Sequence, residues 1–224
     1  MPEVLNGGDH FAYIIGFPDG LVRPYKNISR AEVATIFYRL LKEDVRNKNL
    51  SRENTFTDVT PDQWCNTPIS TMVKMNIFKG RSQQQFDPQT SITRGEFATL
   101  CARFNHVAES NTNNLKDIKG HWAEKEIRSV EALGWILGDQ NNMFRPDDYI
   151  SRAEAITIIN RILQRIPEDK ESLLPGMKVW SDNPPNEWYY LAIQEATNSH
   201  EFIRKPDGFY EKWVKLLPNP VFPV

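Results

Sequence analysis

A pattern of seventeen residues occurs three times in this chain of 224 residues. The copies read GFPDGLVRPYKNISRAE at 16–32, GRSQQQFDPQTSITRGE at 80–96 and GDQNNMFRPDDYISRAE at 138–154. They share a first Gly, a Pro at position nine, an Ile at position thirteen and a closing S/T-R-x-E. Successive copies start 64 and 58 residues apart, which indicates one supersecondary unit used three times.

Each copy ends on the start signal of a helix. Ser29 with Glu32 forms a predicted capping box, in which side chain and backbone hydrogen-bond reciprocally, and Thr93 with Glu96 and Ser151 with Glu154 repeat it. Apolar residues then follow a helical period and predict three equivalent buried stripes. These stripes are Val33, Ile36, Phe37, Leu40 and Leu41; Phe97, Leu100, Cys101 and Phe104; and Ala155, Ile158, Ile159, Ile162 and Leu163.

A second helix is predicted after each of three tryptophans. Trp64 lies sixteen residues before Gly80, and Trp122 lies sixteen residues before Gly138, the residues that start the second and third copies. Trp188 lies sixteen residues before the sequence RKPDG at 204–208, which resembles the start of the first copy, and this distance leaves room for about three helical turns and a short loop. We therefore expect an all-α, pseudo-threefold arrangement of helix-loop-helix repeats, closed by the C-terminal helix around Trp188. The tail from Trp213 onward is interpreted as a linker or terminal strap. The predicted division is a single domain at 1–224 with repeats at 10–44, 55–105 and 115–166 and a half unit at 178–213.

Composition limits the partners. A net charge of -2 gives no electrostatic reason to expect nucleic acid or an anionic membrane as a partner. No apolar run approaches the roughly 18 residues of a membrane span, and the first ten residues lack the features of an export signal. Cys65 and Cys101 cannot make a disulfide framework, and Cys101 aligns with core positions of the other copies.

The Arg of S/T-R-x-E is the first candidate binding residue. Arg30, Arg94 and Arg152 fall at the first helical position, where the helix dipole disfavours a cation by about 0.3–1 kcal/mol. Exposed helix N–H groups beside a guanidinium would suit a planar anion such as a carboxylate. The alternative is a salt bridge to the neighbouring Glu or to an acidic residue of the adjacent unit.

The other candidates also recur in threes. Glu32, Glu96 and Glu154 are explained by capping, although they could also orient the Arg. For Gly16, Gly80 and Gly138, a turn with positive φ and close backbone approach to a ligand are compatible interpretations. For Trp64, Trp122 and Trp188, stacking on a sugar face and a lid over the core are equally open.

Other chemistries find no support in the sequence. His10, His106, His121 and His200 are scattered without a ligand spacing, so we expect no metal site and no cofactor. The loop at 139–150 has Ile150 where a calcium-binding EF-hand needs Glu. Neither GxSxG nor a P-loop is present. Acidic residues that recur threefold belong to the repeat, so an enzyme, such as a paired-carboxylate glycosidase, is the minority interpretation.

The motifs together resemble the S-layer homology family. The matching elements are FTDV before Trp64, LKDIKGHWA through Trp122, FPDG with RP at 23–24, FRP at 144–146, and ISRAE, ITRGE and ISRAE. The resemblance spans roughly 11–165, and the half unit extends it to about 208. It implies a helical pseudo-trimer that attaches exported proteins to bacterial secondary cell-wall polysaccharide linked to peptidoglycan, often through pyruvylated N-acetylmannosamine.

The resemblance also implies where a glycan would bind and where the protein works. A pyruvate ketal is a carboxylate on a sugar, so Arg would hold the anion while the Gly loop and an aromatic approach the ring. By family analogy Arg30 works with the 64–80 segment, Arg94 with 122–138, and Arg152 with the Trp188 helix and the Gly16 loop; one or two competent grooves are expected. The implied setting is the extracellular bacterial surface, with cargo domains of a larger surface protein. A protein-interaction or self-assembly module is the alternative function.

Overall fold

The computed structural model describes residues 1–104, 114–220 and 222, and it divides into two compact units. The first unit holds Asn6–Lys26 and Ser151–Pro223, and the second holds Pro2–Leu5 and Asn27–Ile150. His106 lies outside the described residues. The single domain at 1–224 and its repeat boundaries stay predictions.

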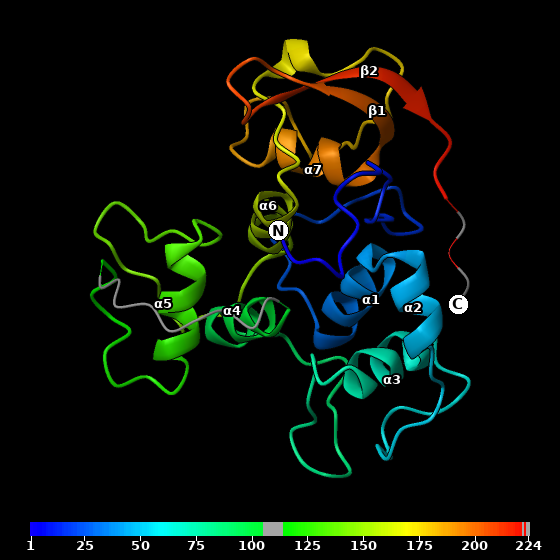
Figure 1. Cartoon of the computed structure of the whole chain (residues 1–224), viewed down its shortest axis with the longest axis vertical. Helices are drawn as coiled ribbons and strands as arrows, with labels where there is room; N and C mark the ends of the chain where they lie inside the picture. The colour runs from blue at the N-terminus through cyan, green and yellow to red at the C-terminus, as the bar shows by residue number, and fades with distance from the viewer. Residues whose placement is uncertain (105–113, 221, 223–224) are drawn as a thin grey trace. The chain divides into compact units, whose positions relative to one another are not determined.

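The second unit is built from pairs of helices. In chain order they are α1 (Arg30–Leu40), α2 (Glu43–Asn49), α3 (Asn66–Lys74), α4 (Arg94–Arg103) and α5 (Glu124–Ala132). Helix α3 packs against α1 and contacts α2, and α5 packs against α4 (Figure 1). Each helix that follows a tryptophan thus packs against a helix that starts at S/T-R-x-E.

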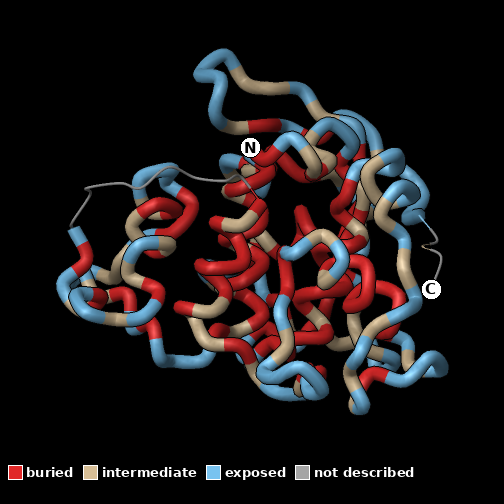
Figure 2. Tube along the Cα trace, turned by 60° about the horizontal axis from the view of Figure 1, so that its bottom comes forward, coloured by how far each residue is buried: buried red, intermediate tan, exposed pale blue. Residues whose placement is uncertain are grey.

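The predicted helix starts are confirmed. Helices α1, α4 and α6 (Arg152–Leu163) begin directly after their Ser or Thr, and both halves of each capping box are formed. The three predicted apolar stripes are buried along their whole length. Figure 2 shows buried residues concentrated on helices and exposed ones along loops. Local capping and helical periodicity therefore predict these elements without tertiary information.

The first unit combines helices with strands. Helix α7 (Tyr190–Thr197) packs against α6. A short 3-10 helix, η1, covers Lys170–Ser172 and contacts β2 (Glu211–Leu217), which pairs antiparallel with β1 (Ser199–Arg204) (Figure 1). No helix in the described ranges has the length and apolar character that crossing a membrane requires.

The prediction of an all-α fold closed by a C-terminal helix is wrong. The hairpin of β1 and β2 follows the last helix, and RKPDG, taken as an echo of the Gly loop, is its turn. There the Lys205 N–H donates to the Tyr210 carbonyl at 2.8 Å, and Gly208 has a φ of 73°. Pro-Asp-Gly favours a tight turn in either context, so this local motif cannot distinguish the two.

The interpretation of the tail as a linker is also wrong, because Trp213 belongs to a core. This side chain is 1% exposed and clusters with Leu173 and Tyr190. Its Nε1–H donates to Oε2 of Glu195 on α7 at 2.8 Å. The inward positions at the start of β2 alternate with outward ones, which is the two-residue period of a half-buried strand. This alternation in the sequence could have predicted a strand here.

Both cysteines are buried and free. Burial raises the pKa of the Cys101 thiol and that of the Cys65 thiol above the ordinary value. The core position predicted for Cys101 is confirmed. Neither side chain has the exposure or lowered pKa of a reactive thiol.

Replacing Trp213 distinguishes a core strand from a linker. We expect Trp213→Ala to lower the free energy of unfolding by about 3–5 kcal/mol, the usual loss for a buried large side chain. Trp188→Ala is the matched control, because Trp188 is 59% exposed, and it should cost under about 1 kcal/mol. Denaturant unfolding followed by circular dichroism measures both, and equal losses would contradict the assignment.

Candidate functional site, an arginine-rich groove

Each Gly loop is held by a carboxylate. Asp58 accepts hydrogen bonds from the N–H groups of Phe86 at 2.9 Å and Asp87 at 2.7 Å. The φ of Asp87 is 59°, a conformation that side chains other than Gly adopt rarely. The same contacts join Asp117 to Phe144 and Arg145, and Asp182 to Val22 and Arg23. Sequence reasoning missed these Asp residues as loop anchors, although each stands five or six residues before a landmark Trp.

Each motif Arg holds the same loop residue from the other side. The Nε–H of Arg30 donates to the Phe86 carbonyl at 2.9 Å, and the guanidinium lies 4.6 Å from the centroid of the Phe86 ring. A second donor of Arg30 binds the Lys79 carbonyl at 2.8 Å. The equivalent contacts run from Arg94 to the Phe144 carbonyl at 2.6 Å and from Arg152 to the Val22 carbonyl at 3.0 Å. The loop-facing donors of these side chains bind backbone carbonyls, a role that neither sequence interpretation included.

The helix N–H groups expected to bind an anion are already occupied. The N–H of Arg30 donates to Thr90 and that of Ala31 to Pro88, at 3.0 and 2.9 Å. Arg94 and Gly95 donate to the equivalent carbonyls of Asp148 and Pro146, and Arg152 and Ala153 to those of Lys26 and Pro24. The N–H of the third residue in each of these helices donates to the side-chain oxygen of the capping Ser or Thr. A buried helix start must satisfy its first donors, and here loop carbonyls do so.

The loop glycines are required for space and not for positive φ. Gly16, Gly80 and Gly138 are absent from the residues with positive φ, so that expectation is wrong. A Cβ at Gly80 would collide with the Phe56 ring and the Ser82 carbonyl, and one at Gly16 with the Trp180 ring. A Cβ at Gly138 would lie 2.7 Å from Leu115. The close approach in this structure is therefore to atoms of the chain itself.

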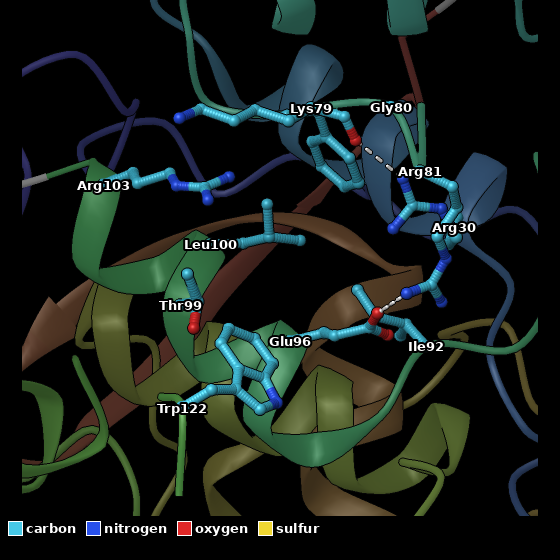
Figure 3. Close-up of a pocket in the computed structure, with 11 residues that line it drawn as sticks. Arg30, Lys79, Gly80, Arg81, Ile92, Glu96, Thr99, Leu100, Arg103 and Trp122 are labelled. Atoms are coloured by element: carbon cyan, nitrogen blue, oxygen red, sulfur yellow. Dashed lines mark hydrogen bonds and ion pairs between the residues drawn. The ribbon is translucent and has the colours of Figure 1, made fainter. Parts of the chain in front are cut away.

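A groove of about 140 Å³ opens beside the second Gly loop, within the second unit (Figure 3). Its walls include Gly80, the C-terminal part of α4 and the side chain of Trp122, which is 63% exposed. Its basic lining residues are Arg30, Lys79, Arg81 and Arg103. Glu96 is its acidic lining residue.

The groove carries an excess of positive charge. Arg81 pairs with Glu96, which leaves the charges of the other basic residues without an acidic counterpart in the lining. Burial, together with the nearby Arg81 cation, lowers the pKa of Arg30 to about 10, so Arg30 stays protonated at neutral pH. Burial also lowers the pKa of Arg103, whose Nη1–H donates to the Ile77 carbonyl at 2.8 Å. The arrangement suits an anion with planar oxygens beside a flat apolar surface.

The structure brings together only part of the predicted set. Arg30, Gly80, Glu96 and Trp122 line the groove. The predicted residues outside its lining are Arg94, Arg152, Glu32, Glu154, Gly16, Gly138, Trp64 and Trp188. The tryptophan is thus Trp122 and not Trp64, the partner that family analogy assigned to Arg30.

Two observations refine the candidate set. Trp64, Trp122 and Trp188 are 48%, 63% and 59% exposed, so the interpretation as core lids is wrong. Sequence reasoning missed Lys79 and Arg81 as groove residues, although they flank Gly80 directly. It missed Arg103 too, although this Arg keeps the register of the repeat with Arg39 and Arg161.

One known protein family matches two segments of the repeat region. The family model of the S-layer homology domain matches residues 55–98 and 114–156. These two segments, 87 of the 224 residues, are similar to S-layer homology repeats. They contain the second and third Gly loops, the Asp58 and Asp117 anchors and the starts of α4 and α6.

Two related proteins match nearly the whole chain, and a third matches about two thirds of it. A cellulosome-anchoring protein of Acetivibrio thermocellus is 36% identical over 214 residues, which cover 93% of this chain and 47% of the relative. Cell surface glycoprotein 1 of the same organism is 34% identical over 95% of this chain and 9% of its own length. An S-layer protein of Bacillus licheniformis is 29% identical over 65% of this chain and 17% of its own length. The chain thus spans about half of the first relative and about a tenth of the second.

Removing a loop anchor tests the hydrogen-bond assignment. We expect Asp58→Ala to lower the free energy of unfolding by about 2–3 kcal/mol, because two backbone donors lose a charged acceptor. Asp62→Ala is the control, since Asp62 is exposed and bonds to Thr60, and it should stay within about 0.5 kcal/mol of the parent. Urea unfolding of the three proteins measures the difference, and indistinguishable midpoints would rule out the anchoring role.

Proposed function

We propose that this chain is a noncatalytic module that anchors a larger protein to the bacterial cell wall. Its ligand is an acidic wall polysaccharide, with a pyruvylated amino sugar as the recognised unit. The observation that carries this proposal is the groove lined by Arg30, Lys79, Arg81 and Arg103, with Glu96 as its acidic lining residue, beside the exposed indole of Trp122. A guanidinium binds a carboxylate through paired hydrogen bonds, and an indole packs against the apolar face of a sugar ring.

The relatives support anchoring as the shared property. Proteins named for cellulosome anchoring and for the cell surface match more than nine-tenths of this chain. An exoglucanase and an amylopullulanase also match, but over only 14% and 8% of their own lengths. A segment shared by proteins with such different names suits a module that joins different cargo domains to one location. We infer that the location is the extracellular face of the wall and that the module has no catalytic role.

We further propose that 10–44 and 178–213 belong to the same set of repeats. Asp182 contacts the first Gly loop as Asp58 and Asp117 contact the second and third. Arg152 completes that contact through the Val22 carbonyl. The remaining predicted residues stay candidate ligand contacts on the strength of their repeat positions alone.

A self-assembly module is the second candidate, because S-layer proteins stand among the relatives. In that case the partner would be protein and the glycan would be irrelevant. The two functions differ in their response to removal of the wall polysaccharide. Sedimentation of the purified chain with wall sacculi before and after chemical removal of the polysaccharide distinguishes them. Loss of binding supports the anchor, and retained binding supports the protein module.

Charge and aromatic variants test the groove directly. We expect Arg81→Ala and Trp122→Ala each to weaken cosedimentation with sacculi about tenfold, which corresponds to about 1.4 kcal/mol. Both side chains have exposed parts, so the fold should persist, and circular dichroism checks this. Lys48→Ala, an exposed cation on α2 in the same unit, should bind as the parent does. Undiminished binding by the Arg81→Ala/Trp122→Ala double variant would exclude this groove as the glycan site.

A further inference from the structure

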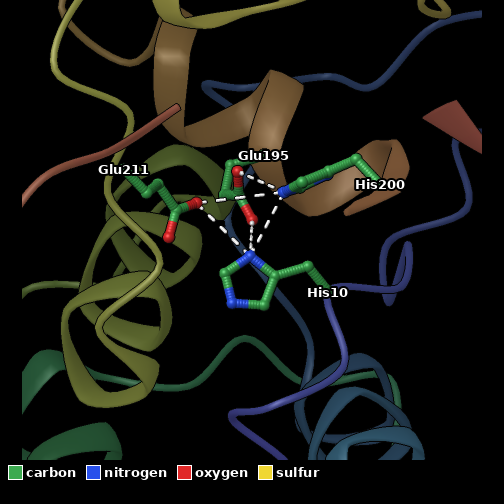
Figure 4. Close-up of side chains that lie close together, drawn as sticks. All are labelled: His10, Glu195, His200 and Glu211. Carbon is green, nitrogen blue, oxygen red and sulfur yellow. Dashed lines mark hydrogen bonds and ion pairs between the residues drawn. The ribbon is translucent and has the colours of Figure 1, made fainter. Parts of the chain in front are cut away.

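Four side chains with metal-binding atoms converge inside the first unit (Figure 4). They are His10, which precedes the first Gly loop, Glu195 on α7, His200 on β1 and Glu211 on β2. Their candidate ligand atoms all lie within 4.8 Å of one another, and all four residues are buried. His10 and His200 are 190 positions apart in the chain, so no sequence spacing could reveal them as a pair.

The distances from the two imidazole nitrogens to the carboxylates are close to those between zinc ligands, with Oε1 of Glu195 nearer His10 and Oε2 nearer His200. Nδ1 of His10 lies 3.2 Å from Nε2 of His200, 3.4 Å from Oε1 of Glu195 and 3.3 Å from Oε1 of Glu211. Nε2 of His200 lies 3.3 Å from Oε2 of Glu195 and 3.9 Å from Oε1 of Glu211. Four ligands at the usual zinc bond lengths of about 2.0–2.1 Å stand about 3.3 Å apart in tetrahedral geometry.

Both imidazole rings are held in place. Nδ1 of His200 lies 2.9 Å from the Asn198 carbonyl, so it carries the proton and leaves the Nε2 lone pair facing the cluster. This second hydrogen bond is the usual support of a metal-binding His. The His200 ring stacks on Trp213 with centroids 4.0 Å apart, and the His10 ring stacks on Phe202 at 3.7 Å.

The two carboxylates of the cluster differ in how their oxygens are satisfied. Glu195 and Glu211 bring two carboxylates, and the fully buried Arg165 pairs with Glu195 at 2.9 Å. Glu211 is also fully buried, yet neither of its oxygens accepts a hydrogen bond from the described part of the chain. Arg204, which is partly exposed, approaches it at 3.4 Å. A buried carboxylate without donors is unfavourable, and a cation among the four groups would offset this penalty.

We propose that His10, Glu195, His200 and Glu211 form a structural site for one divalent zinc ion. Two imidazole nitrogens and two carboxylate oxygens suit zinc, whereas calcium and magnesium prefer oxygen ligands throughout. A groove of about 580 Å³ bordered by His10 and His200 lies beside the buried cluster. The ion would fasten the segment before the first Gly loop to α7 and the hairpin. This proposal departs from the expectation, drawn from the sequence, of no metal site.

The full chain itself provides the first test. The protein is stripped with a chelator, incubated with zinc chloride, gel-filtered and analysed by mass spectrometry for metal content. We expect one zinc per chain and, at a free zinc concentration 100 times the dissociation constant, a melting temperature about 5–10 °C higher. Cobalt should give the strong visible absorption of a tetrahedral complex. Absence of retained zinc, together with an unchanged melting temperature, would show that the cluster does not bind the ion and would overturn the proposal.

Isosteric variants locate the ion. His10→Gln and Glu211→Gln should each abolish zinc retention and the zinc-dependent rise in melting temperature. His121→Gln, which removes a His paired with Asp147 in the other unit, should leave both unchanged. Retention of zinc by both cluster variants would place the ion elsewhere and overturn the assignment. If either variant does not fold, the zinc content and cobalt spectrum of the parent chain decide.

Discussion

The repeat depends on one contact, in which the start of a helix meets the loop of another copy. The first N–H groups of α1 need acceptors because they are buried, and the carbonyls of Pro88 and Thr90 in the second loop provide them. Arg30 binds the Phe86 carbonyl from the same side, and Asp58 holds the Phe86 N–H from the other. Helix start, guanidinium and carboxylate thus fasten one loop. The primary role of the S/T-R-x-E motif is therefore to hold the copies of the repeat together.

This has a consequence for recognition. If the repeated residues hold the loops, then the residues that differ between copies set what each copy can bind. Arg81 adds a cation to the groove in the second unit, whereas the corresponding positions in the other copies are Phe17 and Asp139. The repeated residues therefore build the same backbone arrangement in each copy, and the charge of the residue that follows the loop Gly differs from copy to copy. One strongly positive groove accords with binding by a subset of copies.

Segments that are far apart in the sequence build the fold of the first unit. His10 meets His200 across nearly the whole sequence, and Trp213 fills a core with Leu173 and Tyr190. A hairpin needs packing on one face to be stable, and α7 with this core provides it. A zinc ion bound at the proposed site among these buried polar groups would stabilise the hairpin together with the segment around His10.

Sequence alone determined the helix starts, the buried stripes and the helices after each Trp, because capping and helical periodicity act over a few neighbouring residues. It also identified Arg30, Gly80, Glu96 and Trp122, which belong to the repeated pattern. Only the tertiary structure decided that the tail forms a hairpin, since Pro-Asp-Gly makes the same tight turn in either setting. Only the tertiary structure shows that Arg81 and Arg30 line one groove and that the first helix N–H groups donate to loop carbonyls. It also shows the contact between His10 and His200. Those arrangements could not be predicted from the sequence, because they join residues that are distant in the chain and whose spacing follows no local pattern.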